Sequence, residues 1–341
     1  MNIRNRQAIF ANGKTSMRFL SSNQSRRGFI KQFAVATSTL AISRLFGAET
    51  KKEIPTRILG RTNAKVTILG LGTAPIGEAF VEPKEAERIF GEVLDRGVNY
   101  VDTARIYGHA EEILGRLVPQ RRDKLFLVTK VWTETAAAAE KSLSESLQRL
   151  KVDYVDLVHI HHIGGKNLDK VLADDGVLPY LLKQKEAGKL RFIGVSGHAR
   201  PSNFLKILET GKIDVVMAVM NYADRNIYDF EGKVIPECIK QNVGVVAMKV
   251  YAGIKGGFPN HKKGWVGCAT PPDRLKQAMY YALDLKGVCV ANVGPFTFEQ
   301  AIQNVEFARN YRPLTDEERN NLLAFGKELA QTLGPRYGPT T

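Results

Sequence analysis

Hydrophobic residues in this chain gather in short runs rich in Val, Ile and Leu, and longer amphipathic stretches separate the runs. Short continuous apolar runs are typical of strands that are buried on both faces, as in a parallel sheet. The predicted strands are residues 67–72, 100–102, 125–130, 155–160, 192–196, 215–220, 244–248 and 288–291. The predicted helices between and after them are residues 83–95, 111–118, 136–150, 177–187, 201–210, 234–241, 274–285 and 297–309.

Eight alternating strand–helix pairs predict an α/β fold of the closed (β/α)8, or TIM, barrel type. The alternative is a doubly wound open sheet, whose first strand usually leads into a Gly-x-Gly-x-x-Gly turn. Here Gly70 and Gly72 supply the first two glycines, but Pro75 stands in place of the third, so the barrel is favoured. Residues 57–60 and 65–68 predict an N-terminal β-hairpin that closes the barrel floor. The Thr-Asp-Glu-Glu run at residues 315–318 predicts the start of a C-terminal tail helix that ends near residue 333.

The formal net charge of +14 is distributed unevenly. Residues 1–48 contain eight Lys and Arg and no Asp or Glu, which leaves +6 on residues 49–341. A charge of this size on so long a chain does not indicate nucleic-acid binding, and no basic stripe interleaved with aromatic residues is present. The three cysteines are an odd number without Cys-x-x-Cys spacing, so a zinc-ribbon type of metal cluster is not expected; pairing of two of them stays open.

The acid-free N-terminal region has the pattern of a secretion signal. Arg26 and Arg27 precede Phe29 and Lys31, and a short, weakly apolar run follows at residues 33–45. The stretch resembles a twin-arginine (Tat) signal peptide, which implies that residues 1–48 direct the folded chain through the Tat export machinery to the periplasm. Cleavage is expected near Ala48, although the bulky Phe46 before it leaves a retained membrane anchor as an alternative. Residues 49–341 then form the barrel domain, in which no other segment is long enough to span a membrane.

Ionisable residues stand at three consecutive strand ends of the predicted barrel, where the reactive groups of this fold collect. Asp102 ends the second strand, with Tyr107 in the loop after it; Lys130 ends the third strand, and His161 ends the fourth. A carbonyl that accepts hydride needs a proton donor, and a tyrosine donates well when a nearby cation lowers its pKa. We therefore predict that Tyr107 is a general acid. In this scheme Lys130 tunes the phenol and Asp102 holds Lys130.

The motifs around these residues carry a family resemblance. Asp-Thr-Ala-x-x-Tyr-Gly begins at Asp102, and Asp-Tyr-Val-Asp-Leu-x-x-Ile-His begins at Asp153 and ends at His161. Together with Glu-Glu-x-Leu-Gly at residues 111–115, they resemble the aldo-keto reductase family over about residues 57–310. The resemblance implies that Asp102, Tyr107, Lys130 and His161 form a catalytic tetrad in which His161 orients the carbonyl. It also implies an NAD(P)-dependent oxidoreductase that acts on an aldehyde, ketone or sugar carbonyl.

The same resemblance implies that a nicotinamide dinucleotide lies along the later strands, NADP being favoured over NAD. The residues expected to contact it are Thr73, Asp102, Ser196, Gly197, Met248, Lys249, Gly294, Thr297, Gln300 and Asn304. The chain departs from the family at Met248, where a Tyr is common, and at Met217, where a Gln is common. The Phe-Thr-Phe run at residues 296–298 replaces a group that often grips the 2′-phosphate. If the protein is exported with its cofactor, the dinucleotide should be tightly held and regenerated in place.

Trp132, two residues after Lys130, is expected to line the substrate pocket. The long segment 252–272 is expected either to build part of the pocket wall or to be a solvated loop; it contains Phe258, His261, Lys262, Lys263 and Trp265. The sequence does not select one physiological substrate among small carbonyl compounds.

Two other functions remain open from the sequence. The altered cofactor contacts allow a non-catalytic redox sensor or partner subunit that binds the dinucleotide. His159 and His161 alternate on one strand, and His198 follows the next, which resembles the metal site of amidohydrolases and indicates a metal-dependent hydrolase. The carboxylate expected on the eighth strand of such a hydrolase is missing, because Asn292 lies there. No metal is therefore predicted.

Overall fold

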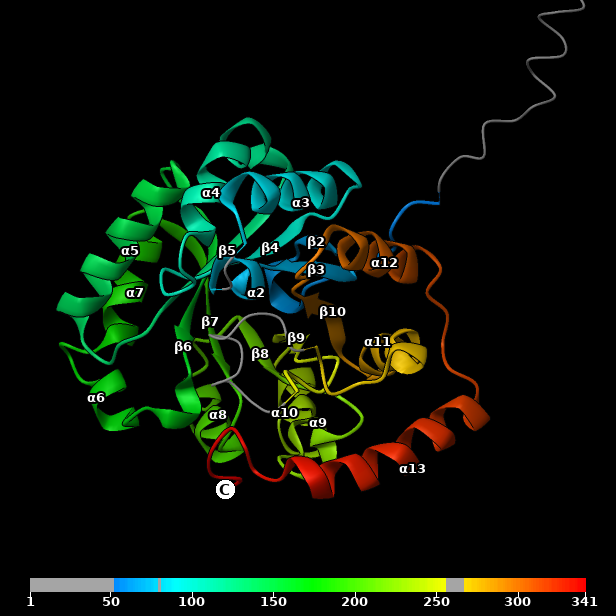
Figure 1. Cartoon of the computed structure of the whole chain (residues 1–341). Helices are drawn as coiled ribbons and strands as arrows, with labels where there is room; N and C mark the ends of the chain where they lie inside the picture. Colours follow the sequence, from blue (N-terminus) through cyan, green and yellow to red (C-terminus); the bar gives the residue numbers. More distant parts are fainter. Residues whose placement is uncertain (1–51, 79–80, 256–266) are drawn as a thin grey trace, which may run out of the picture. The chain divides into compact units, whose positions relative to one another are not determined.

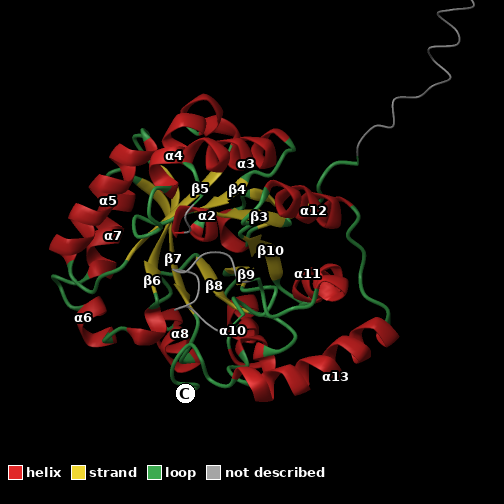
Figure 2. Ribbon diagram, in the orientation of Figure 1, coloured by secondary structure: helices red, strands yellow, loops and turns green. Residues whose placement is uncertain are grey.

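The computed structural model describes residues 52–78, 81–255 and 267–341, so the predictions on the leader and on the aromatic and basic residues at positions 258–265 lie outside the described residues. Residues 52–341 form one compact unit. Eight parallel strands close into a barrel in the order β10-β3-β4-β5-β6-β7-β8-β9, which confirms the predicted (β/α)8 architecture. Figure 2 shows the strands at the centre and the helices around them.

The barrel strands agree with the predicted runs to within one or two residues at most ends. They are β3 (Leu69–Gly72), β4 (Tyr100–Asp102), β5 (Phe126–Val131), β6 (Val155–His161), β7 (Leu190–Gly197), β8 (Val215–Val219), β9 (Gly244–Met248) and β10 (Val288–Val293). The strand β10 is two residues longer at its C-terminal end than the sequence predicts. The ladder to β3 therefore includes Asn292, which pairs with Gly70.

The helices include short ones that the hydrophobic pattern does not reveal, such as α6 and α9. Their bounds are α2 (Ala74–Glu78), α3 (Pro83–Asp95), α4 (Ala110–Leu117), α5 (Ala136–Leu150), α6 (Leu168–Leu172), α7 (Val177–Glu186), α8 (Pro201–Leu208), α9 (Phe230–Lys233), α10 (Ile235–Lys240), α11 (Leu275–Asp284), α12 (Phe298–Arg309) and α13 (Asp316–Leu333). None of these helices combines the length and the apolar character that a membrane span needs.

The predicted hairpin closes the bottom of the barrel. Strands β1 (Thr56–Ile58) and β2 (Lys65–Thr67) pair antiparallel. Leu59 and Val66 are fully buried in the cluster that fills the barrel interior, where they meet inward side chains such as Leu157 and Val246. Apolar side chains thus fill this end of the barrel interior, whereas Asp102, Lys130 and His161 lie at or near the opposite, carboxyl ends of their strands.

The tail helix α13 begins as predicted, with a capping box in which Thr315 and Glu318 satisfy each other's backbone amides. After α13 the chain turns back to the barrel, and Figure 1 shows the C-terminus beside α8. The Arg336 guanidinium donates two hydrogen bonds of 2.8 Å to the buried Asp224 carboxylate. The backbone N–H of Arg200 donates to the Pro339 carbonyl at 2.8 Å. These contacts hold residues 336–339 against the barrel rim.

All three cysteines are free thiols, so the pairing that the sequence left open does not occur in this structure. Cys238 and Cys289 are buried, whereas Cys268 is half-buried. Burial raises the pKa of the Cys238 thiol to about 12, and thiolate chemistry at neutral pH is disfavoured there.

Candidate active site

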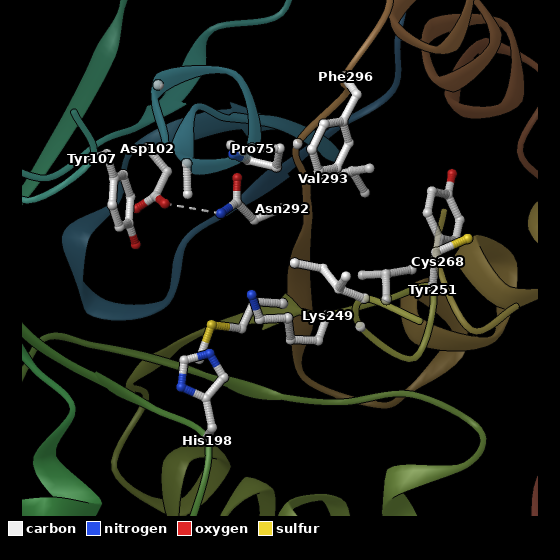
Figure 3. A pocket seen from close by; sticks show the side chains of 18 of the residues that line it. Pro75, Asp102, Tyr107, His198, Lys249, Tyr251, Cys268, Asn292, Val293 and Phe296 are labelled. Atoms are coloured by element: carbon white, nitrogen blue, oxygen red, sulfur yellow. Dashed lines mark hydrogen bonds between the residues drawn. The ribbon is translucent and has the colours of Figure 1, made fainter. Parts of the chain in front are cut away.

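A cavity of about 1440 Å³ opens at the carboxyl ends of the strands. Small-molecule pockets usually measure about 300–1,000 Å³, so this one has room for two ligands side by side. Its lining includes Asp102, Tyr107, His161, Trp132 and Lys249. Figure 3 shows Tyr107 and Asp102 on one side of the cavity, with His198 on the other and Lys249 between them.

An ion pair lies at the base of this cavity. The Lys130 ammonium donates to Oδ1 of Asp102 at 2.6 Å and to the Thr103 carbonyl at 2.8 Å. The Asn292 amide donates to the other Asp102 oxygen, Oδ2, at 3.0 Å. Burial raises the pKa of the Asp102 carboxyl, and the positive charge of Lys130 opposes that rise. A charge pair this deeply buried is held by its surrounding donors and acceptors rather than by solvent.

Tyr107 and His161 lie above the ion pair. The Lys130 ammonium is 4.8 Å from the centroid of the Tyr107 ring. The rings of Tyr107 and His161 meet edge to face at 5.9 Å. Burial lowers the pKa of the His161 imidazole well below its usual value, and the charge of Lys130 lowers it further. His161 is therefore neutral at physiological pH and carries one donor and one acceptor nitrogen. The structure thus brings the four predicted catalytic residues together around one corner of the cavity.

The residues expected to hold the cofactor differ in their surroundings. Ser196 is buried, and its hydroxyl has no hydrogen-bond partner among the described residues. A buried hydroxyl without a partner is costly, which fits a site that takes a polar ligand group. Gly197 packs against Phe204, where a side chain would crowd the ring. Thr73 is fully buried, and its hydroxyl donates to the Asp102 carbonyl, so it supports the site rather than lining the cavity.

The far end of the cavity is built from β9, β10 and α12. Met248, Lys249 and Gly294 line it, and Lys249 adopts a left-handed backbone conformation with φ 55°. At Gly294 a Cβ atom would lie 2.5 Å from Pro75, so only glycine fits there.

Three further predicted cofactor contacts belong to α12 and its N-cap. Thr297 caps the helix by accepting from the Gln300 backbone, while Gln300 and Asn304 face the cavity. The Asn304 side-chain oxygen accepts a hydrogen bond from the Tyr251 hydroxyl at 2.6 Å. The cavity size and the lining residues Met248, Lys249, Gly294, Gln300 and Asn304 fit an extended dinucleotide, whereas Ser196 and Gly197 lie outside the lining.

The other histidines that the structure describes are not arranged as a metal site. His159 points into the barrel and is fully buried. Its ring occupies the space beside Gly194, where a Cβ atom would lie only 2.4 Å from Nδ1 of the ring. His162 stacks on Trp132 instead. Across the described ranges, no group of three or more His, Cys, Asp or Glu side chains is arranged to hold a metal ion. The hydrolase alternative thus has no ligand set in the part of the chain that the structure describes.

Several residues of the site are not predicted by the sequence, and Asn292, Arg336 and Tyr337 are the most informative of them. In the sequence Asn292 stands where a metal-binding carboxylate would be expected, whereas in the structure its amide donates to Asp102. Arg336 and Tyr337 come from the segment after the tail helix and line the cavity. A sequence signal for Asn292 exists, since a polar residue interrupts an apolar strand. Only the three-dimensional return of the chain brings Arg336 and Tyr337 to the site.

The mouth of this barrel combines the Tyr107 phenol, the buried Lys130–Asp102 pair and a cavity large enough for a dinucleotide. This combination is typical of an oxidoreductase of the TIM-barrel class. The profile of the aldo/keto reductase family matches residues 68–264. The chain is 31% identical over 285 residues to L-galactose dehydrogenase of Arabidopsis thaliana, covering 74% of this chain and 88% of that protein. It is 26% identical over 309 residues to the oxidoreductase YqkF of Bacillus subtilis, which is described as uncharacterized, covering 80% and 96%.

Solved structures agree with these relationships. An aldo-keto reductase of Bacillus halodurans in its holo form superposes with a TM-score of 0.65 at 27% identity, covering 82% of this chain and 97% of that one. An aldo/keto reductase of Klebsiella pneumoniae, solved with NADP and acetate, shares the fold with a TM-score of 0.64 at 21% identity, covering 85% and 100%. The chain therefore belongs to the aldo/keto reductase family and is an NAD(P)H-dependent oxidoreductase.

Proposed function

We propose that this enzyme reduces, or reversibly oxidises, the carbonyl of a small polar compound, with Tyr107 as the general acid. The observation that carries the proposal is the buried Lys130–Asp102 pair beside the Tyr107 ring, on the wall of a cavity that His161 also lines. The bound dinucleotide supplies the hydride. The carbonyl oxygen that accepts the electron pair would then need a proton, and this chain's own residues would provide it.

The residues of this chain donate the proton and stabilise the group that loses it. The Tyr107 O–H bond breaks and its proton completes the alcohol, while the Lys130 ammonium stabilises the phenolate that remains. Asp102 fixes the ammonium, and neutral His161 donates a hydrogen bond to the substrate oxygen. Solvent then returns a proton to Tyr107. One proton would thus pass from solvent through Tyr107 to the substrate oxygen in each reduction.

The test is Tyr107→Phe, which removes the proton and keeps the ring. Carbonyl reduction should fall by about 10²- to 10⁴-fold, as for the loss of a general acid. Dinucleotide affinity, measured by fluorescence titration, should stay within about twofold. Tyr311→Phe is the matched control, because its hydroxyl bonds to Asp284 outside the cavity. Undiminished reduction in Tyr107→Phe would refute the assignment.

For the cofactor, we infer that NADP is used in preference to NAD. The NADP bound to the Klebsiella pneumoniae structure supports this preference. The cations Lys249 and Lys255 on the cavity wall supply charge for phosphate groups. Mass spectrometry of the supernatant from heat-denatured native protein identifies a dinucleotide directly. Recovery of NAD alone, or of no dinucleotide, contradicts this inference.

For the substrate, the relationship to an L-galactose dehydrogenase supports a sugar carbonyl or its cyclic hemiacetal. The reaction then runs between a hemiacetal carbon and its lactone, or between an aldehyde and an alcohol. In both reactions the Tyr107 hydroxyl exchanges the proton with the substrate oxygen: it donates the proton in reduction and accepts it in oxidation.

For the location, we propose export of the folded, cofactor-loaded enzyme by the Tat route. The support is the pair Arg26–Arg27, followed by Phe29 and Lys31, in an acid-free leader. Replacing both arginines by lysine should leave the enzyme in the cytoplasm of an expressing bacterium, measured by fractionation and immunoblotting. Periplasmic recovery of that double variant at the wild-type level would contradict the proposal.

A further inference from the structure

A row of four aromatic and imidazole rings borders the cavity, beginning beside the catalytic His161. We call Trp132, His162, His198 and Tyr337 the ring ledge. The Trp132 ring lies 4.8 Å from that of His161 and stacks on His162 at 5.2 Å. The row continues from His162 to His198 at 6.3 Å and from His198 to Tyr337 at 5.1 Å. All four residues line the cavity.

The backbone conformation that positions the His162 ring is uncommon. His162 adopts a left-handed backbone with φ 60°, a conformation that a non-glycine residue adopts at an energetic cost. At Gly165 a Cβ atom would lie 2.5 Å from the His162 ring, and the three atoms nearest to it all belong to that ring. The chain therefore combines backbone strain with a glycine to place this imidazole flat against Trp132.

Tyr337 is likewise positioned by a glycine, together with contacts from distant parts of the chain. At Gly253 a Cβ atom would lie 2.2 Å from the Tyr337 hydroxyl, so the glycine leaves room for it. The neighbouring Arg336 is fixed by its two hydrogen bonds to Asp224. The backbone N–H of Tyr337 donates to the Tyr228 hydroxyl at 2.7 Å. These contacts position Tyr337 against His198.

The chemistry of the ledge combines flat faces with polar edges. Burial lowers the pKa of His162 and, more strongly, that of His198, while the charges of Lys166 and Lys249 act in the same direction on the two rings. Both imidazoles are thus neutral at physiological pH, and each presents one donor and one acceptor. Trp132 adds an indole N–H, and its side chain is half-exposed to the cavity mouth.

Because Trp132 contacts His161 and stacks on His162, a ligand whose reacting carbon lay between Tyr107 and His161 would extend beside Trp132 and His162. A flat hydrocarbon there would cover the polar edges of the rings without bonding to them, which disfavours its binding because those groups lose their water partners. Hydroxyl groups both donate and accept, so they match neutral imidazole edges, while the C–H faces of a saturated ring pack on the indole.

Resting on the proposed carbonyl chemistry, we propose that the ring ledge is a subsite for a polyhydroxylated six-membered ring, with His162 as its specificity-determining residue. The anomeric carbon of this ring lies at Tyr107 and His161. Its other hydroxyl groups bond to the edges of His162 and Trp132.

The test compares two ligand types that share the same hemiacetal. D-glucose, D-galactose, D-mannose and L-galactose carry the additional hydroxyl groups, whereas tetrahydropyran-2-ol carries none. Calorimetric titration into the dinucleotide-loaded enzyme should show at least one hexose binding about tenfold more tightly than tetrahydropyran-2-ol. Tighter binding of benzaldehyde than of every hexose, or no preference for any hexose, would overturn the proposal.

Two variants locate the effect on His162. His162→Phe keeps a ring and removes its polar edge, so it should weaken hexose binding about tenfold and leave tetrahydropyran-2-ol within about twofold. Gly165→Ala displaces the ring without changing its chemistry and should give a loss in the same direction. Gly91→Ala is the matched control, because its Cβ would meet only Leu117, at 3.8 Å, on a distant helix. Equal losses for both ligands in His162→Phe would count against the assignment.

Turnover separates this inference from the proposed function. If tetrahydropyran-2-ol is oxidised with NADP⁺ but no hexose is preferred, the carbonyl chemistry stands and the ledge assignment is wrong. If a hexose binds preferentially through His162 but neither ligand type is turned over, the ledge binds as proposed and the oxidoreductase mechanism is assigned wrongly.

Discussion

Asn292 donates its side-chain amide to the Asp102 oxygen that Lys130 does not take, at 3.0 Å. The Asp102 carboxylate is therefore held from two sides, by a cation on β5 and by a neutral donor on β10. A hydrogen bond to a buried charged group contributes about 1.5–3 kcal/mol. Asn292 thus contributes to the position of Lys130, and through it to Tyr107.

Replacing Asn292 by Leu should lower kcat about tenfold or more, because Asp102 loses one of its two side-chain donors and Lys130 gains freedom. Single-turnover measurement of hydride transfer tests this directly. Asn310→Leu is the control, since the Asn310 amide bonds to the exposed end of α12. An unchanged hydride-transfer rate in Asn292→Leu would mean that Lys130 alone fixes the carboxylate.

Acid should unfold this protein through its buried histidines. Burial lowers the pKa of His159, His161 and His198 well below the usual value. Above about pH 6.5 both the folded and the unfolded chain keep them neutral, and their contribution to stability is fully present. As pH falls below that value only the unfolded chain takes up protons, so stability is lost at about 1.4 kcal/mol per pH unit for each histidine.

Denaturant unfolding at several pH values between 5 and 7.5 measures this slope. His159→Leu should reduce the slope below pH 6.5 by about one proton, because that ring no longer titrates. A wild-type free energy of unfolding that is flat from pH 7 to pH 5 would show that these rings accept protons while folded.

Glu111 should lower the stability of the protein as the pH rises, in contrast to the buried histidines. Its carboxyl group is buried behind β5, where one oxygen accepts from the Thr129 hydroxyl at 2.7 Å and burial raises its pKa. The folded state therefore holds its proton to a higher pH than the unfolded state does, and stability falls as pH rises above the unfolded pKa of about 4.3. Glu111→Gln removes this loss and should stabilise the protein by about 1 kcal/mol at pH 7. Chemical denaturation of both proteins at pH 4 and pH 7 separates the charge effect from packing.

The Arg336–Asp224 pair should be worth more than a surface salt bridge. The side chain of Asp224 is fully buried and that of Arg336 is 12% exposed. Removing one partner leaves an uncompensated buried charge, at a cost of about 3–5 kcal/mol. Arg336→Met and Asp224→Asn should each destabilise strongly, while the double variant should recover much of the loss. If the two single losses simply added, the pair would not be coupled in the folded state.

Much of the architecture was predictable because it depends on local patterns. Apolar runs gave the barrel strands, and the polar residues at their ends gave Asp102, Lys130 and His161. The ends of elements were less certain: β10 continues to Val293, because its pairing with β3 rather than its composition sets its length.

The wall of the cavity was not predictable for a different reason. Tyr337 reaches the site only because Asp224 and Gly253, far away in the sequence, receive Arg336 and the tyrosine ring. His162 likewise reads as one of three clustered histidines, and nothing in its neighbours' composition predicts the left-handed turn that aims it at Trp132. Such contacts arise from long-range packing, which periodicity does not encode.

The closure of the barrel has a consequence for how the enzyme matures. Asp102 and Asn292 are 190 positions apart and meet only when β10 pairs with β3. Without the pairing of β10 with β3, the Asp102 carboxylate lacks one of its two side-chain donors. The Lys130–Asp102 pair lies on neighbouring strands, but the second side-chain donor to Asp102 arrives only with the strand that completes the barrel.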